Sequence, residues 1–120
     1  MLRNESADYI VSAGNSSNLE FDANGHTVSF GDEGIGAIAG STLTLKDSKG
    51  TGTYKASCID PFDSTIIIES GNFDIEEFGF GLEMAYGNLI INGGKFSIDP
   101  SDYVSKWHTA NKVGDWWIVE

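Results

Sequence analysis

Apolar and polar residues alternate in a short segment that recurs four times along the chain. Each copy has a triplet whose first and third residues are apolar, a turn and then a second apolar strand, with glycine at most of the turns. The first residues of the triplets are 24, 23 and 23 residues apart. A repeat of constant length in this range is typical of solenoid proteins, in which each repeat buries its apolar face against the next. The triplets begin at Leu19, Leu43, Ile66 and Leu89.

The period within each triplet is two, which is the period of a β-strand. Stacking the copies at the strand spacing of about 4.8 Å would align their apolar side chains in two inner columns. Burial of these side chains would contribute on the order of 12–24 kcal/mol before conformational entropy is subtracted. The columns are Leu19–Leu43–Ile66–Leu89 and Phe21–Leu45–Ile68–Ile91.

Further alternating apolar residues follow each triplet and predict additional strands in each repeat. We therefore predict an all-β fold: a right-handed, single-stranded parallel β-helix of about four coils with a short C-terminal helix/strand cap. The alternative is an antiparallel sandwich with strands every 8–12 residues. The constant spacing of the triplets favours the β-helix. The residues of the additional strands include Val28 and Phe30, then Tyr54, Ala56 and Cys58, then Phe73 and Ile75, and finally Phe96 and Ile98.

The chain divides into three parts on this interpretation. Residues 1–15 form an N-terminal extension and cap, residues 16–98 the coils, and residues 99–120 a C-terminal cap. Asp99 and Pro100 resemble the start of a helix, and Trp116–Val119 is predicted as a closing strand. Large aromatic rings suit the cover of an open coil end. The predicted cap residues are Tyr103, Trp107, Trp116 and Trp117.

The net charge is −11, from 18 acidic and 7 basic residues. Binding of nucleic acid is not expected, because phosphate contacts require lysine and arginine. Membrane insertion is not expected either, since no apolar run approaches the ~18 residues of a spanning helix. The N-terminus lacks the apolar segment of a signal peptide. Cys58 stands alone, so no internal disulfide is expected, and its place in an alternating segment predicts burial.

Carboxylates are the reactive groups present in quantity. Several lie near the third repeat, where they could act as an acid–base pair or hold Ca²⁺. Solvated turn residues are the favoured interpretation, because the basic groups that such chemistry needs are scattered along the chain. His26 and His108 are 82 residues apart and predict no metal site. No cofactor is expected.

Two isoleucines occupy the outward position of the third and fourth triplets. Ile67 and Ile90 correspond to Thr44 and Glu20 in the other two copies. Aligned apolar residues on an outer face usually mark a contact with another protein. The alternative is a pair of ordinary scattered surface residues. We predict a subunit interface at Thr44, Ile67 and Ile90.

Two segments resemble a known group of proteins. Residues 21–28 (FDANGHTV) resemble the "LDLNGHTI" coil of bacterial and bacteriophage β-helix proteins. Residues 93–104 (GGKFSIDPSDYV), followed by a Gly-Asp-Trp strand, resemble the closing element of that group, which usually reads GGTFSxDPSxYV. The group includes phage tail, fibre and head-surface proteins and cell-surface proteins of gut bacteria. The resemblance implies a projecting or decorating module without enzymatic activity, often trimeric.

Two functional hypotheses follow. The first is a homotrimeric, non-enzymatic protein of the virion surface, such as a head decoration, head fibre or tail fibre module, with capsid or tail proteins as partners. The second is a carbohydrate-binding or polysaccharide-processing domain of a phage or bacterial surface protein, in contact with a host-surface glycan. The predicted glycan contacts for the second hypothesis are Tyr54, Asp60, Phe62, Asp63 and Glu69.

Overall fold

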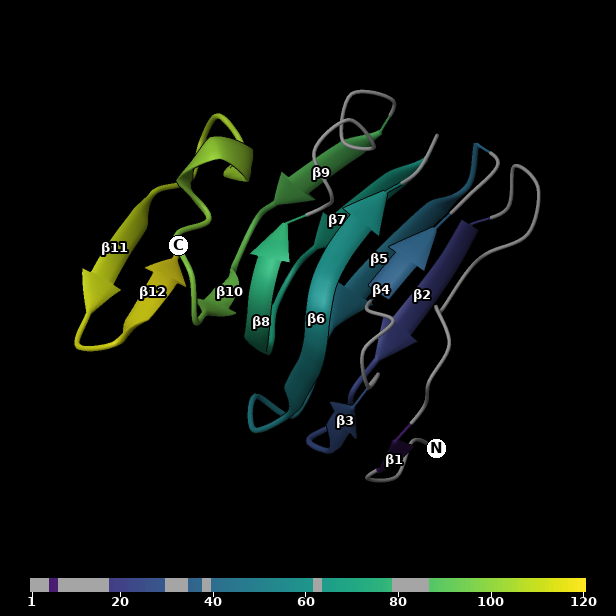
Figure 1. Cartoon of the computed structure of the whole chain (residues 1–120), viewed down its shortest axis with the longest axis horizontal. Helices are drawn as coiled ribbons and strands as arrows, with labels where there is room; N and C mark the ends of the chain where they lie inside the picture. Colours follow the sequence, from purple (N-terminus) through teal and green to yellow (C-terminus); the bar gives the residue numbers. More distant parts are fainter. Residues whose placement is uncertain (1–4, 7–17, 30–34, 38–39, 62–63, 79–86) are drawn as a thin grey trace.

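The computed structural model describes residues 5–6, 18–29, 35–37, 40–61, 64–78 and 87–120. The described part is almost entirely β-structure, with one 3₁₀ turn, η2 (Ser101–Tyr103) (Figure 1). The strands are β1 (Glu5–Ser6), β2 (Asn18–Asp22), β3 (Thr27–Ser29), β4 (Ile35–Ala37), β5 (Thr42–Lys46), β6 (Thr53–Pro61), β7 (Thr65–Ile68), β8 (Asn72–Phe78), β9 (Asn88–Ile91), β10 (Gly94–Phe96), β11 (Ala110–Val113) and β12 (Trp116–Val119).

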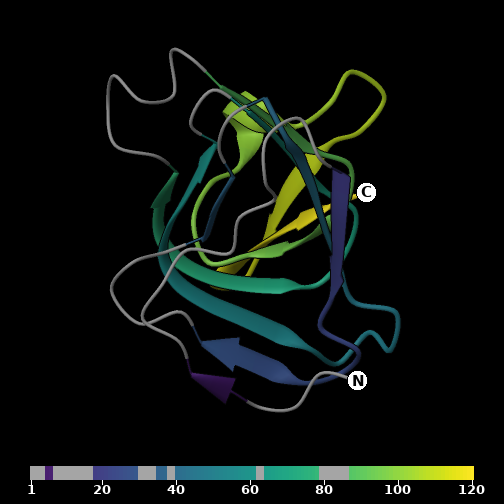
Figure 2. The same ribbon diagram turned by 90° about the vertical axis from the view of Figure 1, so that its right-hand side faces the viewer.

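The strands form two sheets, and the chain passes repeatedly from one to the other. The four-stranded sheet has the order β2-β5-β7-β9, and the eight-stranded sheet has the order β1-β3-β6-β8-β10-β12-β11, with β4 paired to β6. Figure 2 shows the strands of the two sheets around a shared interior, with successive repeats one behind the other. Pairing is parallel from β1 to β10, which contradicts the antiparallel sandwich for the described strands.

The register of the four-stranded sheet confirms both predicted inner columns. Leu43 pairs with Leu19 on one side and with Ile66 on the other, and Ile66 pairs in turn with Leu89. The second column, Phe21–Leu45–Ile68–Ile91, aligns in the same way two residues further along each strand. Within the two middle coils these side chains are fully buried. Because the sequence spacing matches one coil, every coil places its apolar residues at the same depth.

A column of aromatic rings fills the eight-stranded side of the interior. The ring of Phe73 stacks on Tyr54 at a centroid distance of 4.8 Å and on Phe96 at 5.1 Å. All three side chains are fully buried. Parallel pairing in register places one ring directly above the next, which explains the nearly parallel planes. Cys58 is also buried, as its alternation predicts.

The corner between the two sheets is held by a buried carboxylate. Asp47 accepts hydrogen bonds from the backbone N–H groups of Gly25 at 2.7 Å and Gly52 at 2.6 Å. Gly25 has a φ of 81°, and it follows Asn24 at 51°, so this turn adopts the left-handed conformation that asparagine and glycine tolerate. Asp47 thus ties the corner of one coil to the turn of the coil before it.

The C-terminal segment differs from the prediction in one respect. The sequence predicts a short helix that starts near Asp99 and Pro100, but the structure has only the three-residue 3₁₀ turn η2, which ends at Tyr103. Val104 is extended and forms a parallel bridge with Ile91, because pairing with β9 satisfies its backbone. Asp99 accepts a hydrogen bond from the Ser101 backbone at 2.9 Å, in a turn rather than at a helix N-cap. The predicted closing strand is confirmed as β12, and β11 pairs with it as a hairpin.

Of the predicted N-terminal extension and cap (residues 1–15), the structure describes β1 (Glu5–Ser6), and the rest lies outside the described residues. Among the described residues, no helix has the length and apolar character needed to cross a membrane.

Candidate interaction surface

The predicted interface residues form one continuous row on the outer face of the four-stranded sheet. Thr44 pairs in register with Ile67, and Ile67 pairs with Ile90. All three side chains are half-buried, so each offers part of its surface to solvent. Glu20 precedes them in the same row, opposite Thr44. We call Thr44, Ile67 and Ile90 the outer row.

The alternation of inward and outward side chains along each strand determines where the outer row lies. In β7, Ile66 and Ile68 point into the core and are fully buried, so the pleat directs Ile67 outward. The same alternation in β9 buries Leu89 and Ile91 and directs Ile90 outward. Adjacent strands at about 4.8 Å bring the two outer isoleucines into lateral contact range. The result is a ridge of methyl groups across neighbouring coils.

Polar side chains border the outer row. Asn18, Thr42, Thr65 and Asn88 form a parallel row along one side, in register from β2 to β9. At the first coil, the Lys46 ammonium lies 2.8 Å from the Glu20 carboxylate. The hydrogen bond with Glu20 and its negative charge raise the pKa of Lys46. An apolar centre with a polar border is the general arrangement of a protein–protein contact.

Buried Tyr54 helps to fix the positions of β2 and β5, the first two strands of the four-stranded sheet. The Tyr54 hydroxyl lies 2.6 Å from the backbone carbonyl of Lys46 and 3.1 Å from that of Phe21, so it donates to carbonyls at the ends of β5 and β2. Burial is the main cause that raises the pKa of Tyr54, so the phenol stays protonated at neutral pH. Its hydroxyl therefore acts as a fixed donor between the first two coils.

Tyr54 was predicted as a glycan contact, and its burial contradicts that prediction. The side chain is 0% exposed and its ring is stacked inside the core. Glu69 is exposed, and its carboxylate accepts a hydrogen bond of 3.4 Å from the Asn92 amide. Phe62 and Asp63 lie outside the described residues, as does the side chain of Asp60. Of the predicted set, Glu69 is therefore the one described side chain that is exposed to solvent.

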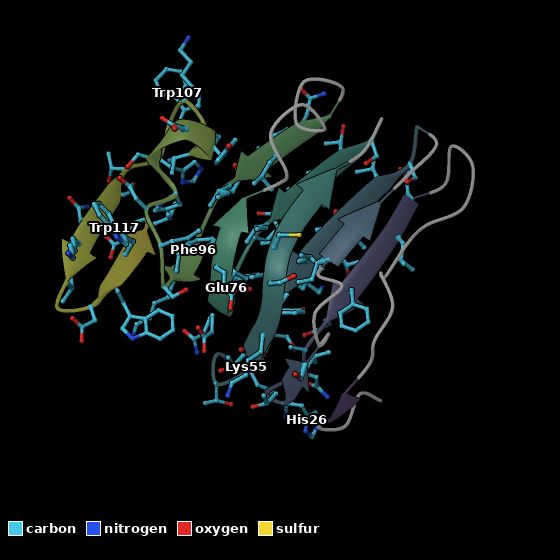
Figure 3. The ribbon with its side chains drawn as sticks, in the orientation of Figure 1. His26, Lys55, Glu76, Phe96, Trp107 and Trp117 are labelled. Atoms are coloured by element: carbon cyan, nitrogen blue, oxygen red, sulfur yellow. The ribbon has the colours of Figure 1, made fainter. Side chains whose placement is uncertain are left out.

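The predicted cap residues fall into two groups. Tyr103 and Trp117 pack against the core at the C-terminal end, as expected of a cap. Trp116 lies on the outer face with the Lys95 ammonium 5.3 Å from its ring centroid. Trp107 is 85% exposed and projects away from the ribbon, so it does not cover the coil end (Figure 3).

The remaining polar candidates have local roles in turns. Asp22 accepts hydrogen bonds from the backbone of Asn24 at 2.8 Å and of Ser48 at 3.0 Å, and the latter is the main cause that lowers its pKa. His26 lies at the turn before β3 (Figure 3), whereas His108 lies in the turn before β11, where its backbone N–H donates to the Ser105 carbonyl. Within the described part of the chain, no group of three or more histidine, cysteine or acidic residues could hold a metal ion.

Sequence reasoning missed the role of Asp47 and the strand β11. The signal for Asp47 was present: an acidic residue two positions after an apolar triplet and before a glycine turn. The signal for β11 was weak, because its four residues show no clear alternation. Comparisons of this chain with protein-family models, with curated proteins and with solved structures find no match.

Proposed function

We propose that the chain is a short right-handed parallel β-helix that serves as a non-enzymatic structural module of the virion surface, assembled as a homotrimer. The single observation that carries the proposal is the outer row, in which Thr44, Ile67 and Ile90 align on consecutive coils and remain partly exposed. In a closed threefold assembly, a ridge that lies on the symmetry axis meets the same ridge of the other two copies. The module acts through shape and stability rather than through a reaction.

The coil path supports the β-helix and its handedness. Each strand of the four-stranded sheet connects to its parallel neighbour through a strand of the other sheet. Connections between parallel neighbours of one sheet are right-handed in about 98% of known cases. The same connection repeats from β2 to β10, so one hand would apply to the whole stack.

The virion location is supported by the two segments that resemble phage and bacterial surface proteins. Residues 21–28 run from the end of β2 through the Asn24–Gly25 turn into β3, which makes them a coil corner. Residues 93–104 run through β10 and η2 to the bridge at Val104, after the last strand of the four-stranded sheet. The locations of the two segments support the proposal.

The trimer is tested by light scattering after size exclusion, with Ile67→Asp as the diagnostic variant. We expect the wild-type mass to be three times that of the 12.9 kDa chain and the mass of Ile67→Asp to be that of a monomer. A buried carboxylate without a partner opposes the contact strongly. Thr53→Asp is the matched control: it adds the same charge at a half-buried outer position of β6, and we expect it to remain trimeric.

A wild-type chain that stays monomeric, or an Ile67→Asp variant that stays trimeric, contradicts the proposed interface. Circular dichroism of each variant checks that the strands remain folded. The location is tested separately by probing purified virions with an antibody against the chain. Binding to immobilised polysaccharide, measured on a glycan array, would instead support the carbohydrate-binding hypothesis.

A further inference from the structure

The eight-stranded sheet ends on a strand that has one open edge. β11 is the last strand in the sheet order, and among the described residues it pairs with β12 alone. Figure 1 places it at the end of the molecule opposite β1, with no other ribbon beyond it. An edge of this kind has backbone N–H and C=O groups that can pair with another chain.

The register identifies which backbone groups face the open edge. Thr109 and Glu120 exchange both backbone hydrogen bonds at 3.0 Å, so they form a hydrogen-bonded pair of the antiparallel ladder. Such pairs alternate along the ladder with pairs whose backbone groups point away. Asn111 therefore bonds toward β12, whereas the backbone groups of Ala110 and Lys112 point outward.

We propose that β11 pairs antiparallel with β11 of a second copy of this chain, around a twofold axis through Asn111. Ala110 of one copy then lies opposite Lys112 of the other, and each pair exchanges both backbone hydrogen bonds. The two outward residues are two positions apart, so the edge is complementary to itself in this register. The pairing joins the eight-stranded sheets of two copies into one continuous sheet.

The charge distribution favours this end of the molecule for contact between identical copies. Residues 94–120 contain three lysines and four acidic residues, whereas residues 1–93 contain four basic and fourteen acidic residues. Two chains of net charge −11 repel each other, and the repulsion acts over a screening length of about 8 Å at physiological salt. The C-terminal segment is nearly neutral, so it can approach its own copy with the smallest electrostatic cost.

The side chains around β11 suit the same contact. Val113 is 58% exposed, and the half-buried Trp116 pairs with it in the hairpin, so the outer face has an apolar patch beside the open edge. A lysine on an edge strand often prevents pairing. Here the Lys112 ammonium lies 5.9 Å from the ring centroid of Trp117, over the hairpin rather than across the edge.

The pairing is tested by sedimentation velocity over a concentration series, in the Ile67→Asp background and in the wild type. Ala110→Pro removes an outward N–H and leaves the β12 ladder intact, because proline is tolerated where an edge N–H faces solvent. Ala110→Ser keeps the N–H and is the matched control. We expect the mass of Ile67→Asp to double as its concentration rises. Ala110→Pro should raise the dissociation constant of this dimer at least tenfold, whereas Ala110→Ser should leave it unchanged. Added NaCl should strengthen the doubling by screening the repulsion.

Doubling in the Ile67→Asp background separates this contact from the proposed trimer, since that variant removes only the outer row. A constant mass at every concentration overturns the β11 pairing, as does equal doubling in Ala110→Pro and Ala110→Ser. Growth into species larger than twice the starting mass also overturns it, because a closed twofold contact stops at two. A trimeric wild type that doubles to a hexamer supports both proposals.

Discussion

The two ends of the coil stack bury the same columns to different degrees. Leu19 and Leu89 are the first and last residues of one inner column, yet Leu19 is 38% exposed and Leu89 is 7% exposed. In the other column Phe21 is half-buried, whereas Ile91 is fully buried. Identical positions in a repeat therefore differ in burial according to what lies beyond them.

The C-terminal end is covered by the segment that follows the last coil. Val104 bridges Ile91, and the Ser105 backbone N–H donates to the Ile91 carbonyl at 3.0 Å, so the chain adds a partial strand to the four-stranded sheet. Tyr103 and Ile98 pack on the core beside it. At the other end β2 is the last described strand of this sheet. A repeat protein depends on such covers, because its terminal repeats lack a neighbour on one side.

The largest expected effect is the loss of a ring at the covered end. Phe96→Ala should lower the free energy of unfolding by about 4 kcal/mol, because the ring is fully buried and stacked on Phe73. Phe21→Ala, at the other end, should cost roughly half as much, since that side chain is already partly solvated. Urea denaturation of both variants measures the difference. Equal losses would show that the two ends contribute alike to stability.

Two glycines in the turns differ in how closely other atoms approach them. A Cβ at Gly93 would lie 2.5 Å from the Glu69 backbone carbonyl oxygen, so Gly93→Ala should cost about 3 kcal/mol. Gly50 in an earlier corner has no atom within 4 Å of such a Cβ, and its φ is 79°. Gly50→Ala should therefore cost only the conformational strain, about 1 kcal/mol. Thermal unfolding of the two variants provides the test, and a reversed order would contradict the steric explanation.

The buried carboxylate of Asp47, which accepts hydrogen bonds from Gly25 and Gly52, gives a third test. Asp47→Asn replaces one acceptor oxygen by an amide N–H group that faces a backbone donor, either Gly25 or Gly52. We expect a loss of about 2 kcal/mol, because a buried donor without an acceptor is costly. In Asp47→Asn, backbone amide hydrogen exchange should be accelerated relative to the wild type more at β2 and β3 than at β9 and β10. Uniform acceleration over the whole chain would mean that Asp47 stabilises more than the corner.

The smallest expected effect concerns acid pH. The Ser48 backbone N–H lowers the pKa of Asp22, and the hydroxyl of Ser101 lowers that of Asp99 at the other end. A carboxyl whose pKa is lower in the folded than in the unfolded chain stabilises the fold above about pH 4, and this contribution is lost as pH falls through the folded pKa. In Asp22→Asn and in Asp99→Asn, the free energy of unfolding should fall less steeply as the pH is lowered. The difference from the wild type should be less than about 1 kcal/mol, because both carboxylates are screened by solvent. Urea midpoints between pH 2 and 6 measure this, and an unchanged slope would rule out the contribution.

The repeat made the core predictable, because alternation and constant spacing assign both the depth and the coil of each apolar residue. The same local pattern predicted where Ile67 and Ile90 would point. The alternation with Ala56 and Cys58 already indicated that Tyr54 points inward, and the predicted glycan contact disregarded it. The pattern did not show how the buried hydroxyl is satisfied, because its acceptors are backbone carbonyls of β2 and β5. The predicted helix after Asp99 was wrong because pairing with Ile91 competes with local helix propensity and prevails at Val104.

The constant register also sets the unit in which this molecule could change its length. Thr42, Thr65 and Asn88 occupy equivalent places 23 residues apart. An insertion or deletion of one whole repeat would leave every remaining pair aligned, while a one-residue change within a strand would turn its apolar side chains to the wrong face. Length variants should therefore differ by whole coils, each adding about 4.8 Å to the axis. Each added coil would also extend the outer row by one residue.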